Sequence, residues 1–276
     1  MEKIIVQGRL LFGIAILAYG VENFFCAHLG LTVRGVPWFS TNPLVAYPTG
    51  VVLVAAGLSI VTGVRARTTA ILLGILFLLY VLLFELSAVA ARPMSVGVRT
   101  VFFEALAMSA SALTLAGTLP SDRSEARPWD TVLDKLIWSG PYLFGISSVV
   151  FGIDHFLVLS FIASLVPAWL PGHMFWAYLT GAAFILAGIS ILTRRMDQWG
   201  EFMLGTMFLI WFLILHSPRV VIAFRSHNPN IQNECSSALI ALGMCGGCWI
   251  CAWHAQQRRG HESRLPGFLL RDQQVA

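Results

Sequence analysis

Charged residues are scarce in this chain, and the scarcity excludes most classes of water-soluble protein. Only 12% of the 276 residues are charged, whereas 57% are apolar. Apolar runs of about 20 residues, the length that crosses a hydrocarbon core of ~30 Å, recur from one end of the chain to the other. The composition predicts an integral membrane protein whose main partner is the lipid bilayer.

The sequence also lacks the short motifs of the familiar soluble chemistries. It contains no phosphate-binding loop, nucleophile elbow, zinc-protease helix or dinucleotide fingerprint. No basic stripe interleaved with aromatic residues accompanies the net charge of +4, so a nucleic-acid partner is not predicted. A membrane β-barrel is not expected either, because barrel strands are short and alternating whereas these apolar runs are continuous.

Cysteine is rare, with five residues, but three of them form a regular pattern. Cys245, Cys248 and Cys251 make a C-x2-C-x2-C run that His254 extends, and this superficially resembles an iron-sulfur motif. On a continuous helix, steps of three residues rotate successive side chains by about 60°, so these groups fan outward and cannot converge on one cluster. Provided that the helix continues through residues 246–247, we interpret the cysteines as small residues at a helix contact.

Internal repetition is what the sequence has in abundance. Residues 10–24, LLFGIAILAYGVENF, are matched by residues 142–156, YLFGISSVVFGIDHF. Residues 46–62, AYPTGVVLVAAGLSIVT, are matched by residues 177–193, AYLTGAAFILAGISILT. A near-constant offset of about 131 residues over successive apolar segments predicts a tandem duplication.

Each copy of the repeat contains four candidate membrane spans. The spans cover residues 8–26, 44–63, 69–91, 98–118, 137–160, 174–193, 200–216 and 233–254. The predicted fold is therefore an all-α integral membrane protein with eight transmembrane helices in two tandem four-helix bundles. Because an even number of spans gives parallel repeats, we expect a pseudo-twofold axis along the membrane normal.

The predicted domain boundaries follow from the polar segments between and after the spans. We expect a first repeat at 1–118, a polar linker at 119–136, a second repeat at 137–256 and a basic tail at 257–276. Most arginine and lysine residues lie on the face that holds the termini and the linker. The opposite face is left with Arg34, Arg92, Arg99, Arg219 and Arg225. Because positive charge accumulates on the cytoplasmic side, both termini, the linker and the tail are predicted to be cytoplasmic.

Ionisable residues within the predicted spans occur at matching positions of the two copies. Glu22 matches Asp154, Glu85 matches His216 and Glu104 matches Glu234, at close to the offset of the repeat. An ionisable side chain inside the hydrocarbon is costly and usually faces a cavity or a partner. We therefore expect a polar cluster near the outer mouth of each bundle. The candidates for ligand binding or proton relay are Glu22, Glu85, Arg92, Arg99, Glu104, Asp154, His155, His216, Arg219 and Glu234.

Two interpretations of these clusters stay open. In one, the polar residues form buried ion pairs that set the helix register without any ligand. In the other, the second copy, which carries His155 and His216, has the distinct chemistry: it gates a proton, holds a quinone headgroup or ligates a metal. The Glu-x-x-His pairs of di-iron bundles are missing, so hydrogen bonding to a polar headgroup fits better and no metal site is predicted.

Several motifs resemble the DoxX family. They are FGIDHF at 151–156, VP at 166–167, WLPG at 169–172, FWAYLTG at 175–181 and AGIS at 187–190, with VPW at 36–38 in the first copy. DoxX-like proteins are four-helix membrane units, so the resemblance implies two fused copies. Some members are membrane subunits of thiosulfate:quinone oxidoreductase. The resemblance thus implies a bacterial inner-membrane location and makes quinone the candidate cofactor.

The leading functional hypothesis is a quinone-linked or otherwise redox-associated membrane subunit with a polar site near the outer face. One alternative is a non-catalytic accessory subunit that packs beside other membrane subunits of a larger complex. A second alternative is a small-molecule carrier, which the parallel repeat suggests. The substrate and the electron partner cannot be named from these residues.

Overall fold

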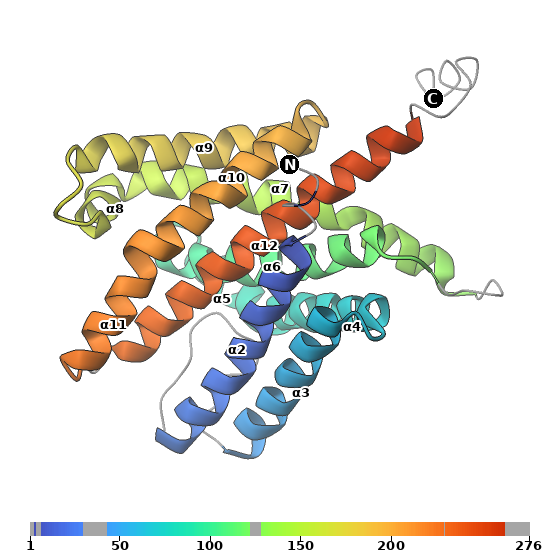
Figure 1. The fold of residues 1–276 in the computed structure, drawn as a ribbon, viewed down its shortest axis with the longest axis horizontal. Coiled ribbons are helices and arrows are strands. Elements are labelled where there is room, and N and C mark those ends of the chain that lie inside the picture. The colour runs from blue at the N-terminus through green and yellow to red at the C-terminus, as the bar shows by residue number, and fades with distance from the viewer. Residues whose placement is uncertain (1–2, 4–6, 30–42, 122–127, 229, 263–276) are drawn as a thin grey trace.

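The computed structural model describes residue 3 and residues 7–29, 43–121, 128–228 and 230–262. Within these ranges every regular element is helical (Figure 1). Among the described residues, eight helices or helix series are long and apolar enough to cross a membrane, which confirms the prediction of an all-helical fold with eight candidate membrane spans. Helices suit this setting because the hydrocarbon offers no water to the backbone, and a helix satisfies its N–H and C=O groups internally.

The first four spans occupy residues 8 to 118. They are α2 (Gly8–Leu29), α3 (Pro43–Thr62), the continuous series α4 (Ala66–Tyr80), η1 (Val81–Glu85) and α5 (Leu86–Ala91), and α6 (Val96–Thr118). The segments labelled η are π-helical turns. The predicted spans agree with these bounds to within a few residues.

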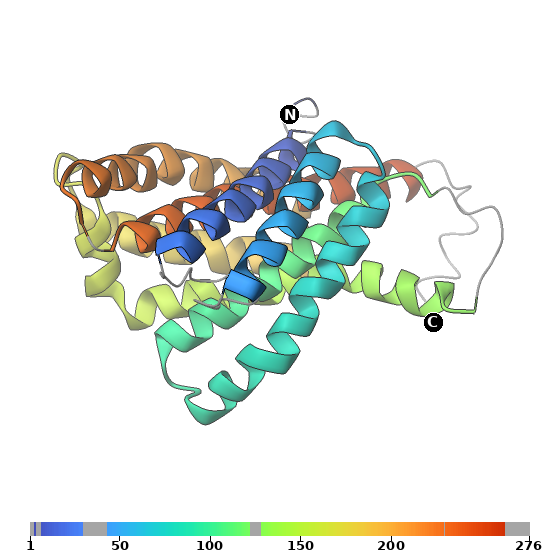
Figure 2. The same cartoon turned by 90° about the horizontal axis from the view of Figure 1, so that it is seen from below.

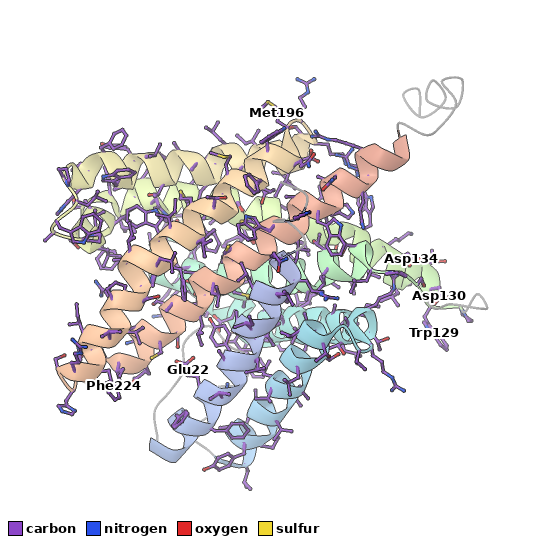
Figure 3. The ribbon with its side chains drawn as sticks, in the orientation of Figure 1. Glu22, Trp129, Asp130, Asp134, Met196 and Phe224 are labelled. Carbon is purple, nitrogen blue, oxygen red and sulfur yellow. The ribbon has the colours of Figure 1, made fainter. Side chains whose placement is uncertain are left out.

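The last four spans follow the same order. They are α7 (Asp130–Leu157), α9 (His173–Thr193), the series α10 (Asp197–Trp211), η2 (Phe212–His216) and α11 (Ser217–Arg225), and α12 (Ile231–Glu262), with the short α8 (Leu159–Leu165) after α7. Helix α7 begins inside the segment predicted as linker, and its first residues, labelled in Figure 3, extend past the body of the bundle. Helix α12 likewise continues past the predicted start of the tail.

The helices define two ends of the molecule. We call the end where α6 stops and α7 starts the linker end. The end where α7 stops and α9 starts is called the cavity end, because a cavity lies there. In Figure 2 the cavity end lies to the left and the linker end to the right. The predicted cytoplasmic face corresponds to the linker end.

Helices α6 and α12 form the centre of the fold. About two-thirds (67%) of the apolar window of α6 and 78% of that of α12 are buried, against 33% for α3. The two helices pack against each other, and each also packs against the first helix of the other half, α6 against α7 and α12 against α2. One hydrophobic core, with residues from both halves, results. The two halves are therefore interlocked through their first and last spans.

Repeated glycines bring the helices of each half close together. A Cβ atom on Gly20 of α2 would lie 2.7 Å from the Gly50 carbonyl oxygen of α3, and one on Gly152 of α7 would lie 2.7 Å from the Gly181 carbonyl oxygen of α9. These separations are too short for any side chain, and small residues allow such backbone approach. The recurring glycines therefore allow close packing of α2 on α3 and of α7 on α9.

The repetition extends to the backbone conformation. Arg65 and Met196 occupy matching positions of the two halves, and both precede a helix with positive φ, 52° and 55°. The π-helical turns Val81–Glu85 and Phe212–His216 also occupy matching positions. The same conformations therefore recur at positions 131 residues apart, although the local sequence differs there.

Candidate functional site

A cavity of about 520 Å³ lies at the cavity end of the second half. Residues from α6, α7, α8, α9, the α10–η2 series and α12 line it. Four residues predicted as site candidates are among them: Glu104, Asp154, His155 and His216. The structure therefore brings together candidates from both halves of the chain in one site.

The wall of the cavity is mainly aromatic and aliphatic. Phe184 of α9 packs edge-on against Phe208 of α10, with ring centroids 5.3 Å apart, and Trp176 lies edge-on to Trp211 at 6.1 Å. All four rings line the cavity, together with Met207 and Met244. An apolar wall with a few convergent polar groups is the usual composition of a small-molecule site, whose volume is commonly about 300–1,000 Å³.

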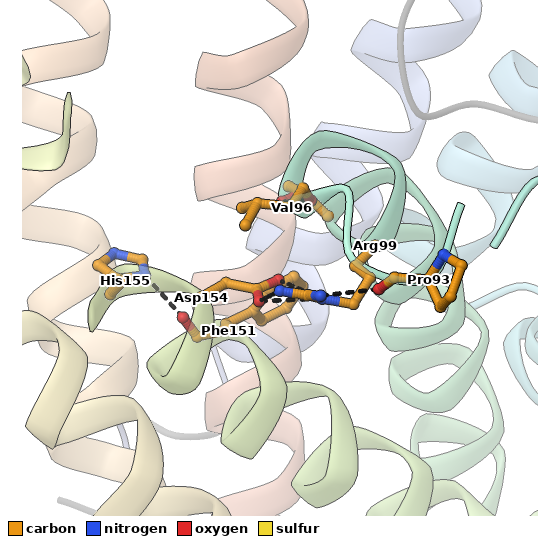
Figure 4. Close-up of polar contacts among 7 residues, drawn as sticks. Pro93, Val96, Arg99, Phe151, Asp154 and His155 are labelled. Atoms are coloured by element: carbon orange, nitrogen blue, oxygen red, sulfur yellow. Dashed lines mark hydrogen bonds and ion pairs between the residues drawn. The ribbon is translucent and has the colours of Figure 1, made fainter. Parts of the chain in front are cut away.

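Asp154 and Arg99 form an ion pair at the edge of this cavity (Figure 4). Arg99 Nε lies 3.1 Å from Asp154 Oδ1, its Nη2 contacts the same oxygen, and its Nη1 donates to the Pro93 carbonyl oxygen at 2.8 Å. Asp154 is 4% exposed. The sequence led us to expect a cluster within each bundle, but this pair joins α6 of the first half to α7 of the second. The interlocked packing explains the difference, because it places α7 beside α6.

The ring of His155 is held by its own helix. Its Nδ1 lies 2.8 Å from the carbonyl oxygen of Phe151, one turn earlier (Figure 4). A carbonyl oxygen only accepts hydrogen bonds, so Nδ1 carries the proton. The other nitrogen, Nε2, of a neutral ring is then an acceptor. Because His155 lines the cavity, it offers a hydrogen-bond acceptor there.

Glu234 and Arg219 form a second ion pair at the cavity end. Arg219 Nε and Nη2 donate to the two carboxylate oxygens at 2.7 and 2.6 Å, which is a bidentate arrangement. Glu234 lies in the first turn of α12, where the helix dipole favours a negative charge. His216, at the end of η2, is close enough to interact electrostatically with both groups and lines the cavity. These three candidates lie together within the second half.

Glu22 and Glu104 lie where α2, α6 and α12 meet. Glu22 Oε1 accepts a hydrogen bond of 2.9 Å from Ser236 Oγ of α12, and Figure 3 shows Glu22 on α2. The buried Tyr19 is within electrostatic reach of both carboxyl groups and donates to the Ser236 carbonyl oxygen at 3.3 Å. Ser236 and Glu104 line the cavity, whereas Glu22 is not among the lining residues. Glu22 contacts the lining from outside, through its hydrogen bond with Ser236.

Glu85 and Arg92 are not part of the cavity lining. Glu85 Oε1 accepts a hydrogen bond of 2.5 Å from the hydroxyl of Tyr80, within the same span of the first half. Arg92 is exposed at the end of α5. The structure thus separates these two candidates from the group around His155.

Sequence reasoning missed the π-helical turns and several hydroxyl groups of the site. Glu85 and His216 each end a π-helical turn, a feature that is often found at functional sites. Thr180 and Ser236 line the cavity, although the sequence does not mark the hydroxyl group of either as part of a site. Sequence reasoning also passed over Asp197 and Glu201, which are buried at the linker end. A search for acidic residues near the start of a span could have found these two.

Helix α12 runs unbroken through residues 246–247, as the argument about the cysteines requires. Cys245, Cys248 and Cys251 are buried and free. Among the residues that the structure describes, no group of three or more His, Cys, Asp or Glu side chains is placed to hold a metal ion.

Comparisons with protein-family models, with curated proteins and with solved structures give no match to this chain. The site is therefore interpreted from its own geometry.

Proposed function

We propose that this chain is a DoxX-like, quinone-linked membrane protein that holds the headgroup of a quinol or quinone in the cavity at the cavity end. The observation that carries the proposal is the cavity of about 520 Å³, with an aromatic wall and with His155, His216 and Glu104 on its lining. A flat ring with an apolar tail suits such a wall, and its two oxygen atoms need the polar groups.

The architecture that goes with this proposal is a fused pair of four-helix repeats about a pseudo-twofold axis. Support comes from the matching helix contacts: α6 packs on α7 as α12 packs on α2, while α6 and α12 meet at the centre. In this arrangement the linker end faces the cytoplasm of a bacterial inner membrane, in keeping with the excess of arginine and lysine there.

The hydrogen bonds around the cavity favour the reduced form of the headgroup. Thr180 Oγ1 donates to the Trp176 carbonyl oxygen at 2.9 Å, Ser236 Oγ donates to Glu22, and His155 Nδ1 donates to Phe151. Each group has its proton engaged outside the cavity and offers lone pairs to a ligand. A quinol has two hydroxyl groups that donate, whereas a quinone only accepts. The quinol therefore matches these three groups better.

The first experiment is mass spectrometry of lipid extracted from protein purified in mild detergent, to detect a co-purified quinone. Isothermal titration calorimetry with a short-chain benzoquinone and with its quinol, under anaerobic conditions, then measures the affinity of each form. We expect the quinol to bind about tenfold more tightly, since one additional hydrogen bond contributes roughly 0.5–1.5 kcal/mol. His155→Leu should weaken quinol binding about 3- to 10-fold.

His173→Leu is the matched control, because His173 begins α9 at the same end of the bundle and is not among the residues that line the cavity. It should leave quinol affinity unchanged. The proposal is wrong if purified protein contains no quinone and binds neither form. Equal losses in the two histidine variants would show that the effect of His155→Leu is not specific to the cavity lining and would remove the support for this site.

A further inference from the structure

A second buried polar site lies at the linker end, far along the same helices from the cavity. Asp197 and Glu201, one turn apart on α10, are 6% and 0% exposed. Neither carboxyl oxygen of Glu201 accepts a hydrogen bond from a nitrogen or oxygen donor among the described residues, and the polar group beside it is the thiol of Cys248. A fully buried carboxyl group of this kind requires an explanation, because an unpaired charge in an apolar interior is costly.

A small pocket adjoins Glu201. Its volume is about 30 Å³, which exceeds the roughly 10–15 Å³ that one ordered water molecule needs. The pocket is lined by polar groups from α7, α9, α10 and α12, namely Tyr142, Arg194, Asp197, Glu201, His254 and Arg258. A water molecule held there has several hydrogen-bonding partners, and Glu201 is one of them.

The charged groups around Glu201 come from α10, from α12 and from Arg194 at the end of α9, whereas α7 contributes aromatic rings. Arg258 Nη2 donates to Asp197 Oδ2 at 2.6 Å, and Arg259 Nη2 contacts Asp197 Oδ1. On the α7 and α9 side, Arg194 stacks over the rings of Trp138 and Tyr142, at 5.8 and 5.4 Å from their centroids. His254 of α12 is within electrostatic reach of Arg194, Asp197 and Arg258, and Cys248 and Cys251 interact with Glu201.

These surroundings act on Glu201 in two opposite directions. Burial favours the protonated, neutral carboxyl group, because ionisation would leave a charge in a medium of low dielectric constant. The thiol of Cys248 can donate a hydrogen bond to the carboxylate and thereby favours the ionised form, whereas the negative charge of Asp197 favours the neutral form. A carboxyl group held between two such effects gains and loses a proton readily when water reaches it.

The matching position in the first half shows that the fold does not need this carboxyl group. Ala70, which stands at the position equivalent to Glu201, is 0% exposed, and Ala66, the equivalent of Asp197, is 4% exposed. Alanine therefore suffices for helix packing at both places. The acidic pair in the second half adds something that packing does not require.

We propose that Glu201 and the pocket beside it form a proton-exchange site that opens toward the linker end. A proton from water binds the carboxylate to give the neutral carboxyl group, and the reverse step returns it to water. The Asp197–Arg258–Arg259 cluster lies between this site and the end of the bundle. The inference does not depend on which molecule occupies the larger cavity.

The test is infrared difference spectroscopy of the full-length protein in detergent, as pH is raised from mildly acidic to alkaline values in H2O and in D2O. We expect a C=O stretching band of a protonated carboxyl group that disappears as pH rises and that moves to lower frequency in D2O. Glu201→Gln should remove this band. Glu85→Gln, which changes another carboxyl group within a span, should leave it in place.

Two results would overturn the proposal. One is a set of spectra that is the same for the parent protein and for Glu201→Gln at every pH. The other is a Glu201 band that does not shift in D2O, which would mean that no water exchanges with the site. If Glu201→Gln does not fold, Glu201→Asp keeps the test decisive: an exchangeable carboxyl band must persist at a changed frequency, and its absence contradicts the assignment.

Discussion

The third span of the first half and the third span of the second half share several backbone features but differ in the side chains that they bury. Each span follows a residue with positive φ, and each contains a π-helical turn directly after a first helix of 15 residues, Val81–Glu85 in one and Phe212–His216 in the other. At the linker end, however, the first has buried alanines where the second has Asp197 and Glu201. We infer from this difference that glycines and apolar contacts determine how the helices are arranged, whereas a few substitutions within that arrangement create the polar sites.

The largest effect on the free energy of unfolding is expected when the buried alanine at position 70 and the buried glutamate at position 201 are exchanged for residues of the opposite polarity. Ala70→Glu places a carboxyl group in a packed apolar site of the first half and should lower the free energy of unfolding by about 4 kcal/mol or more, from overpacking and from the buried charge. Glu201→Leu, of similar volume, should change it by less than about 1.5 kcal/mol in either direction. Denaturant unfolding in detergent measures both. Equal losses of unfolding free energy in Ala70→Glu and Glu201→Leu would show that positions 70 and 201 are not equivalent positions of the same helix arrangement.

A smaller difference in stability is expected between loss of the Arg99–Asp154 ion pair, which joins the two halves, and loss of the Arg219–Glu234 pair within the second half. Arg99→Ala leaves the buried Asp154 without its partner and should cost about 3–5 kcal/mol. Arg219→Ala should cost about 1 kcal/mol or less, because the Arg219 side chain is 39% exposed. Thermal unfolding of the two variants gives the ranking. A larger loss for Arg219→Ala would contradict the interlocked arrangement.

The smallest effect should be the same in both halves. Gly20→Ala and Gly152→Ala each introduce a methyl group against a neighbouring backbone, at α3 and at α9 respectively. Each should cost about 1–3 kcal/mol, since the helices must move apart to accept it. Similar losses of unfolding free energy in the two variants would support a shared arrangement of the first two helices in each half. A loss in only one half would show that the two helix pairs are packed differently.

Much of the fold follows from local features of the sequence. The eight spans were predictable because each is a long apolar run. The bounds of α7 were less predictable. Its first turns contain Asp130, Asp134 and Lys135, and such polar residues are typical of a linker as well as of a helix that extends beyond the hydrocarbon.

The site was predictable only in part. Asp154, His155 and His216 stood out because charge and imidazole are rare in apolar spans, and all three line the cavity. The partner of Asp154 was not predictable, because an offset between repeats shows which positions are equivalent but not which half each one contacts. Thr180 recurs in the repeat and lies in the FWAYLTG motif, but nothing in the sequence marks its hydroxyl group as part of a site, since a threonine whose hydroxyl group bonds to its own helix is ordinary in any span.

By itself, the sequence determined the all-helical membrane class, the number of spans and the matching polar positions, because these depend on hydrophobicity and spacing along one chain. Only the tertiary structure decided that α6 packs on α7 and α12 on α2, that Arg99 pairs with Asp154, and that Glu201 is fully buried beside a small pocket. The reason is physical. Within a bilayer any apolar helix face can pack against any other, so the partners are selected by the fit of side chains across the whole bundle, which no single segment encodes.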